Sequence, residues 1–223
     1  MSILAVIPAR GGSKGIKNKN LISLSGKKLI QYTIEEAKKS SKINKIFVSS
    51  DSKKILDFSK KFRVSTIQRP KKLSRDSSEV YDAIKHLLKY LKKKENYNPK
   101  IVIILQPTSP LRKFYHIDEA IKLLQRNLKA DSLVSCIKVP HNFLPEKLMV
   151  LKNKFLKFSK KIKRRQVSNN YFARNGAAIY IFKYSQVKNS MYGKKTIPYL
   201  MDKISSFDVD EHEDLKILKK LLK

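Results

Sequence analysis

Short apolar runs alternate with amphipathic stretches along most of the chain. Continuous apolar runs predict strands that are buried on both faces, and they lie at residues 3–7, 45–49, 64–67, 101–105, 132–137, 177–182 and 204–209. Helical spacing of apolar residues predicts helices at residues 28–39, 51–62, 77–94, 114–128 and 211–222. Because strands and helices alternate, we expect an α/β fold in which helices cover both faces of a mostly parallel sheet.

Residues 138–175 do not follow this alternation. The segment is basic, contains two prolines, and has short alternating pieces such as residues 154–158 but no long helical pattern. We therefore expect one α/β domain formed by residues 1–137 and 176–223, with residues 138–175 inserted as a small arm. Dimerisation is the use that we expect for this arm.

The chain is strongly basic, with 50 Lys and Arg residues against 18 Asp and Glu residues and a formal net charge of +32. Such a charge can indicate nucleic-acid binding, because phosphate neutralisation dominates that interaction. The basic residues recur as short lysine runs along most of the chain, however, and only nine are Arg, the residue that reads bases and holds phosphates bidentately. We interpret the charge as a solvated lysine surface, with a polyanion partner or a membrane surface as the alternatives.

Composition excludes several classes of protein. Cys136 is the single cysteine, which excludes a disulfide framework and a cysteine-based metal cluster. No apolar run approaches the roughly 20 residues that a membrane helix needs. Met1 leads directly into a strand-like run and not into a signal peptide. We expect a soluble, cytoplasmic protein.

The sequence IPARGGSKGIKNKN, residues 7–20, directly follows the first predicted strand. Its glycines allow the backbone to bring N–H groups close to an anion, and its basic side chains add positive charge. Loops at the carboxyl edge of a parallel sheet are where such folds bind ligands. The spacing matches neither a Walker A loop nor a dinucleotide fingerprint. The alternative is a flexible basic loop without a ligand.

Two further polar segments follow predicted strands. Residues 106–112, QPTSPLR, come after the most apolar strand, and two prolines fix a turn that presents Gln106 and neighbouring hydroxyls; the alternative is a turn that only precedes the next helix. Asp208 and Asp210 end the last predicted strand, where alternate side chains point the same way. Such a pair suits Mg²⁺ bound together with phosphate, but Asp210 is equally suited to cap the following helix.

Six motifs occur in the order known from one family. They are IPARGGSKGIKNKN, Ser50-Asp51, Arg69-Pro70 with Asp76, QPTSPLR, RNGAAIYI at 174–181 and FDVDEHEDL at 207–215. In these motifs the chain resembles the acylneuraminate cytidylyltransferases, also called CMP-sialic acid synthetases, from residue 3 to about residue 218. The resemblance implies a Rossmann-like homodimer that uses Mg²⁺. It also implies transfer of CMP from CTP to the anomeric hydroxyl of a nine-carbon 2-keto sugar acid, with release of pyrophosphate.

The resemblance also implies roles for single residues. The implied catalytic residues are Arg10, Lys19, Asp208 and Asp210. The implied nucleotide-binding residues are Ala9, Arg10, Gly11, Gly12, Ser13, Lys19, Asn20, Arg69 and Asp76. The implied sugar-acid residues are Gln106, Lys147, Arg165, Asn175 and Tyr180. Asp208 and Asp210 match the metal-binding pair of the family, so the resemblance favours Mg²⁺ over a helix cap.

The chain departs from the family pattern in two places. Lys17 stands where the family usually has proline, and residues 140–147 belong to a region that varies with the sugar acid. Sialic, legionaminic and pseudaminic acid therefore all stay open as substrates. Two alternatives to this function are a cytidylyltransferase for an eight-carbon 2-keto acid and, from a different class, a basic nucleic-acid-binding protein.

Overall fold

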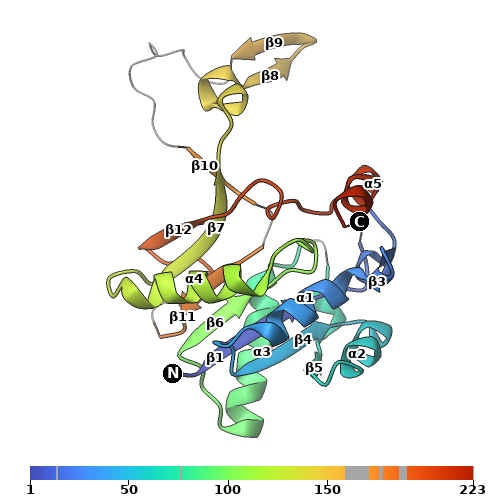
Figure 1. Cartoon of the computed structure of the whole chain (residues 1–223), viewed down its shortest axis with the longest axis vertical. Coiled ribbons are helices and arrows are strands. Elements are labelled where there is room, and N and C mark those ends of the chain that lie inside the picture. Colours follow the sequence, from blue (N-terminus) through green and yellow to red (C-terminus); the bar gives the residue numbers. More distant parts are fainter. Residues whose placement is uncertain (14, 76, 159–170, 176–177, 186–189, 223) are drawn as a thin grey trace.

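The computed structural model describes residues 1–13, 15–75, 77–158, 171–175, 178–185 and 190–222, and its centre is an eight-stranded sheet (Figure 1). The strands of this sheet are β1 (Ile3–Pro8), β4 (Lys45–Ser50), β5 (Ser65–Gln68), β6 (Ile101–Ile104), β7 (Ser132–Lys138), β10 (Phe172–Arg174), β11 (Tyr180–Lys183) and β12 (Thr196–Leu200). The predicted α/β fold is confirmed.

The strands lie in the order β10-β7-β11-β6-β1-β4-β5, and β12 pairs with β7. β1 is parallel to β4 and β6, and β4 is parallel to β5, as the alternation of strands and helices predicts. β11, in contrast, runs antiparallel to both β6 and β7. A parallel neighbour needs a crossover, usually a helix. Because the arm replaces that helix between β7 and β11, the chain returns in the opposite direction.

Helices cover both faces of the sheet, as predicted. They are α1 (Leu29–Lys39), α2 (Lys53–Lys60), α3 (Val80–Glu95), α4 (Phe114–Arg126) and α5 (His212–Leu221). One face of β1, with Ile3, Ala5 and Ile7, belongs to the cluster that contains the apolar sides of α1 and α4. The alternate residues of β1 pack into a second cluster with α3 on the other face. Because successive side chains of β1 point to opposite faces of the sheet, this one strand packs against the helices on both faces.

The strand predicted at residues 204–209 does not form. The chain makes a turn there, in which the Ser205 N–H donates to Asp202 Oδ1 at 2.9 Å. Phe207 and Val209 of this stretch instead pack in a small cluster with α5, whereas Ile204 is exposed. The strand of this region is β12, which the sequence pattern misses because Pro198 interrupts it. Pro198 is tolerated because, among the strands that the structure describes, β12 pairs only with β7 and is therefore an edge strand.

The arm leaves the sheet at the end of β7 and stands away from the rest of the chain in Figure 1. Its described part contains a hairpin of β8 (Met149–Lys152) and β9 (Phe155–Phe158) after the 3-10 turns η3 (His141–Phe143) and η4 (Pro145–Lys147). The side chains of β8 and β9 are exposed. Its use in dimerisation stays a prediction. The remaining short elements are η1 (Lys19–Leu21), β2 (Ser23–Leu24), β3 (Lys27–Lys28) and η2 (Lys71–Leu73).

No helix in the described ranges is both long and apolar enough to span a bilayer.

Candidate functional site

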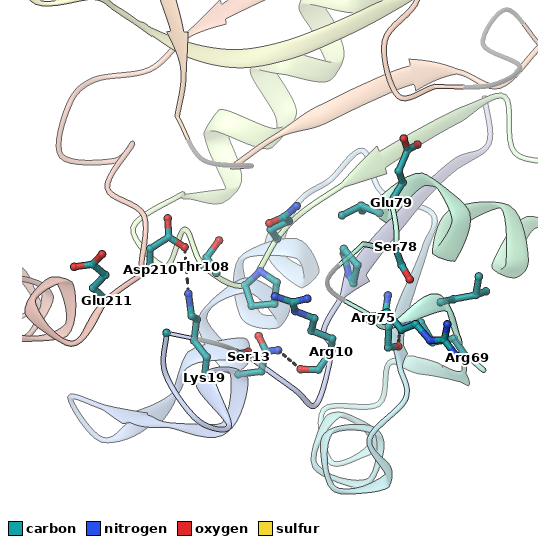
Figure 2. A pocket seen from close by; sticks show the side chains of 18 residues that line it. Arg10, Ser13, Lys19, Arg69, Arg75, Ser78, Glu79, Thr108, Asp210 and Glu211 are labelled. Carbon is teal, nitrogen blue, oxygen red and sulfur yellow. Dashed lines mark hydrogen bonds and ion pairs between the residues drawn. The ribbon is translucent and has the colours of Figure 1, made fainter. Parts of the chain in front are cut away.

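A cavity of about 560 Å³ lies at the carboxyl ends of β1, β5 and β6 (Figure 2). These strands belong to one parallel set, so the segments that follow them emerge at the same edge of the sheet. A fourth segment comes from the region before α5. The lining residues are Pro8, Arg10, Ser13, Gly15, Lys19, Asn20, Arg69, Leu73, Ser74, Arg75, Ser78, Glu79, Val80, Gln106, Pro107, Thr108, Asp210 and Glu211.

Lys19 joins the glycine-rich loop to the segment before α5. Its side chain is largely buried, and its Nζ donates to the Val209 carbonyl at 2.7 Å and to Asp210 Oδ1 at 3.2 Å. A Cβ atom on Gly15 would lie 2.6 Å from the Asp210 carbonyl oxygen, so the two backbones are in close contact. The loop after the first strand and the late aspartates therefore meet at one edge of the sheet, as the sequence predicts.

The loop is held in place by a hydrogen bond within it and by hydrogen bonds to the end of β4. Asn20 Nδ2 donates to the Arg10 carbonyl at 2.8 Å, and the Gly11 N–H donates to Asp51 Oδ1 at 2.9 Å. Ala9 is buried, and its N–H donates to the Ser49 carbonyl at 2.9 Å. Ala9, Gly11 and Gly12 do not line the cavity, whereas Arg10, Ser13, Lys19 and Asn20 do.

Positive charge gathers on the opposite side of the cavity as well. Arg69 follows β5, is buried, and donates from Nε to Ser74 Oγ at 2.8 Å. Burial lowers the pKa of the Arg69 guanidinium and the nearby Arg10 charge lowers it further, while Asp51 acts in the opposite direction. Figure 2 places Arg75 beside Arg69, with Arg10 between them and Lys19. Several like charges around one cavity favour an anionic ligand.

Asp208 and Asp210 are not side by side on an extended strand. Asp210 lines the cavity, and its side chain is 77% exposed. Asp208 turns away toward the 106–112 turn, where its Oδ1 accepts a hydrogen bond from Ser109 Oγ at 3.0 Å. Burial raises the pKa of Asp208, and the charge of Asp210 raises it as well. The two carboxylates are therefore close enough to sense each other electrostatically although they face different groups.

These carboxylates are suited to Mg²⁺ only with help from other ligands. Among the residues that the structure describes, no group of three or more His, Cys, Asp or Glu side chains could hold a metal ion. Mg²⁺, however, is commonly bound by one or two carboxylates together with water and phosphate oxygens. The donor chemistry of Asp208 and Asp210 therefore fits this ion.

Of the predicted sugar-acid residues that the structure describes, Gln106 lines this cavity, whereas Lys147, Asn175 and Tyr180 do not. Asn175 is buried and bonds to the hydroxyls of Ser135 and Ser206. Tyr180 is buried and accepts a hydrogen bond from Arg174 at 3.2 Å. Lys147 lies on the arm, with its Nζ 2.9 Å from His141 Nδ1. Their contact with a substrate stays a prediction.

Two predicted residues, Asp76 and Arg165, lie outside the described residues. The sequence interpretation, in turn, misses three charged residues that line the cavity: Arg75, Glu79 and Glu211. Arg75 and Glu79 flank the predicted nucleotide-binding position 76, which is the signal that could have identified them. Glu211 could have been found as the residue next to Asp210.

Comparison with known proteins places this geometry in a family. The model of a family described as cytidylyltransferase matches residues 4–223. The chain is 33% identical to the N-acylneuraminate cytidylyltransferase of Escherichia coli O18:K1:H7 over 96% of this chain, although it spans 51% of that protein. It is also 33% identical to the CMP-N,N'-diacetyllegionaminic acid synthase of Legionella pneumophila, over 100% of this chain and 97% of that protein. The chain thus spans only about half the length of the first of these relatives.

The fold is also that of a solved structure, CMP:2-keto-3-deoxy-manno-octonic acid synthetase complexed with CTP. The TM-score is 0.72 at 19% identity, with 100% of this chain and 98% of that chain covered. At this identity the likeness concerns the Rossmann-like fold alone. The family match, in contrast, covers the glycine-rich loop, the turn after β6 and the aspartates before α5 together. The chain belongs to the cytidylyltransferase family.

Proposed function

We propose that this chain transfers CMP from CTP to the anomeric hydroxyl of a nine-carbon 2-keto sugar acid and releases pyrophosphate. The observation that carries the proposal is the cavity at the sheet edge, where Arg10, Lys19 and Arg69 surround a space that Asp210 also lines. Relatives that are 33% identical over nearly this whole chain are named for acylneuraminate and diacetyllegionaminic acid. These names support the proposed substrate class.

The basic residues neutralise charge in this reaction. The sugar hydroxyl attacks the α-phosphorus, and negative charge moves onto the departing pyrophosphate. Arg10 and Lys19 hold the β- and γ-phosphates, and the N–H groups of the glycine-rich loop add partial positive charge. Because Val209 and Asp210 fix the Lys19 ammonium, little reorganisation is needed when the charge moves. Positioning and charge neutralisation account for most of the catalysis in this class of reaction.

The nucleoside lies on the side of the cavity opposite Lys19. Segment 69–80 provides Arg69, Ser74, Ser78 and Glu79 there, which offer donors and acceptors for ribose and base. Asp208 and Asp210 would hold Mg²⁺ on the other side. When bound, this ion screens the α-phosphate and lowers the pKa of the attacking hydroxyl.

The sugar acid requires residues that one copy of the chain does not bring to the cavity. Gln106 lines the cavity, whereas Lys147 lies on the projecting arm. We therefore include a homodimer in the proposal, in which the arm of each copy packs against the other. The exposed apolar side chains of β8 and β9 supply a surface that a second copy would bury. As a CTP-consuming enzyme, the protein would act in the cytoplasm.

Pyrophosphate release tests the proposal directly. The purified chain is incubated with CTP, Mg²⁺ and, in separate reactions, sialic, legionaminic or pseudaminic acid, with an eight-carbon 2-keto acid as comparison. We expect release with at least one nine-carbon acid and none without acid. Release with the eight-carbon acid alone would assign the chain to the other substrate class. An inert chain that binds DNA at physiological salt would contradict the enzyme proposal.

A further inference from the structure

Arg112 is a charged residue that lies in the interior of the molecule. Its side chain is 1% exposed, and it ends the QPTSPLR turn after β6. Its Nη1 donates to the Gln106 carbonyl at 3.1 Å and to the Ala178 carbonyl at 2.7 Å. Its Nη2 donates to Thr33 Oγ1 of α1 at 2.7 Å. One guanidinium thus joins the exit of β6, the entry to β11 and the helix layer.

The two carbonyls lie just beyond the point where β6 and β11 stop pairing. β6 and β11 are antiparallel, and their last pair at this end is Ile104 with Tyr180. Continuing this register by two residues places Gln106 opposite Ala178. These residues do not form a strand pair; the same nitrogen of Arg112 bonds to both carbonyls instead. Arg112 therefore lies at the point where the hydrogen bonds between β6 and β11 end, and it sets the distance between the two chains beyond that point.

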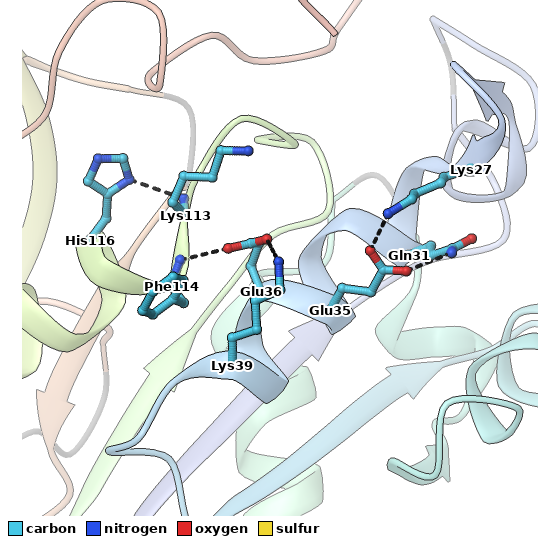
Figure 3. A network of polar contacts seen from close by, with 8 residues as sticks. All are labelled: Lys27, Gln31, Glu35, Glu36, Lys39, Lys113, Phe114 and His116. Carbon is cyan, nitrogen blue, oxygen red and sulfur yellow. Dashed lines mark hydrogen bonds and ion pairs between the residues drawn. The ribbon is translucent and has the colours of Figure 1, made fainter.

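The burial of this charge is costly. Desolvation lowers the pKa of Arg112 to about 10, against the attraction of the Glu36 and Asp208 carboxylates. Figure 3 shows that Glu36 is engaged elsewhere, because it accepts hydrogen bonds from the Phe114 N–H at 2.8 Å and from Lys39 Nζ at 2.7 Å. Arg112 donates only to neutral acceptors among the hydrogen bonds of the described residues. The hydrogen bonds to these neutral acceptors therefore have to offset the desolvation cost of a buried charge.

We propose that Arg112 is a positioning residue for the sugar acid, which rests on the proposed function. Gln106 lies on the cavity, and its carbonyl is one of the two that Arg112 bridges. The next residue is Pro107. Because proline has no backbone N–H, it cannot donate a hydrogen bond that would hold the segment after β6 in place. By holding Gln106 apart from Ala178, Arg112 sets the position of the Gln106 side chain at the cavity wall.

Steady-state kinetics with both substrates test this role. Arg112→Met keeps an unbranched side chain but removes both bridging hydrogen bonds, and we expect the KM for the sugar acid to rise about tenfold or more. The KM for CTP is expected to stay within about twofold, because the Lys19 ammonium is held by Val209 and Asp210 and not by the two bridged carbonyls. Glu36→Gln is the matched control, since it perturbs the same buried region and leaves both carbonyls bridged. It should lower the melting temperature without raising the KM for the sugar acid.

Arg112→Lys covers the case in which Arg112→Met does not fold. A lysine keeps the charge but has no planar fork to bridge both carbonyls in the same geometry, so a raised KM for the sugar acid is again expected. A folded Arg112 variant with the wild-type KM for the sugar acid would overturn the proposal, as would a crystal structure of it with Gln106 unmoved. If the wild-type chain itself releases no pyrophosphate, the proposed function fails, and the positioning role fails with it.

Discussion

Lys19 and Asp210 show how much of the site depends on single side chains. The Lys19 ammonium binds a backbone carbonyl and a carboxylate that is separated from it by most of the chain. Asp210 is an exposed residue, so its ion pair with Lys19 adds little to stability. Asp210 instead contributes a negative charge at the wall of a cavity that is also lined by several cationic side chains.

Asp210→Ala tests this function at the residue scale. If Asp210 helps to hold Mg²⁺, the substitution should lower turnover by about a hundredfold or more at ordinary Mg²⁺. The melting temperature should change little, because the side chain is mostly exposed. Turnover is measured by pyrophosphate release over a range of Mg²⁺ concentrations. Glu213→Ala removes a nearby exposed carboxylate that does not line the cavity and serves as the control. Near-normal turnover of Asp210→Ala would remove the metal role.

At the scale of the element, the backbone of the glycine-rich loop packs directly against the backbone of the segment before α5. Gly12 and Gly15 lie on the same loop, but their surroundings differ. A Cβ atom on Gly15 would meet the Asp210 carbonyl at 2.6 Å, whereas one on Gly12 would have no atom within 4 Å. The approach of the loop to the segment before α5 therefore requires glycine at position 15, and this approach brings Lys19 to Asp210.

Gly15→Ala should push these two segments apart. We expect a loss of about 1–3 kcal/mol in the free energy of unfolding, because backbone can move less easily than a flexible side chain. The KM for CTP should rise in the same variant. Urea denaturation and steady-state kinetics measure the two effects. Gly12→Ala is the matched control for stability and should leave the free energy of unfolding nearly unchanged; an equal loss of stability in the two variants would contradict this explanation.

At the scale of the whole molecule, one region has no packing partner in the described part of the chain. The β8–β9 hairpin exposes Leu151, Phe155, Leu156 and Phe158, each more than half exposed. The main sheet, of which this hairpin is not a part, has helices packed on both of its faces. Exposed apolar patches of this kind mark interaction surfaces. The net charge of +32, spread over many short lysine runs, is a feature of the whole surface and not of this patch.

Leu151→Glu should weaken the proposed dimer. Leu151 pairs with Leu156 across the hairpin, and a charge there would have to be buried in the interface. We expect sedimentation equilibrium to give a dimer for the wild-type chain and a shift toward monomer for the variant. Leu128→Glu alters another strongly exposed leucine, outside the arm, and should stay dimeric. A monomeric wild-type chain or an unaffected Leu151→Glu variant would argue against dimerisation through the arm.

The sequence by itself determined the local features. Apolar runs such as residues 101–105 predict buried strands because burial on both faces requires every residue to be apolar. The prediction that the loop at 7–20 lies at the sheet edge is confirmed. The loop directly follows the first strand in sequence, so it must leave the sheet at the carboxyl end of that strand. The alternation of strands and helices likewise predicted the parallel half of the sheet, where helices form the crossovers.

Only the tertiary structure decided how distant segments face one another. The direction of β11, the pairing of edge strand β12 and the turn of Asp208 toward the 106–112 segment depend on contacts between residues far apart in sequence. Arg112 is the sharpest case. Nothing in QPTSPLR shows that its arginine lies inside the molecule, because only the Gln106 carbonyl belongs to this motif, and its other two acceptors come from α1 and from the entry to β11. The local sequence pattern predicts whether a residue is buried or exposed. It does not predict which distant residues it contacts, because the tertiary fold brings those residues together.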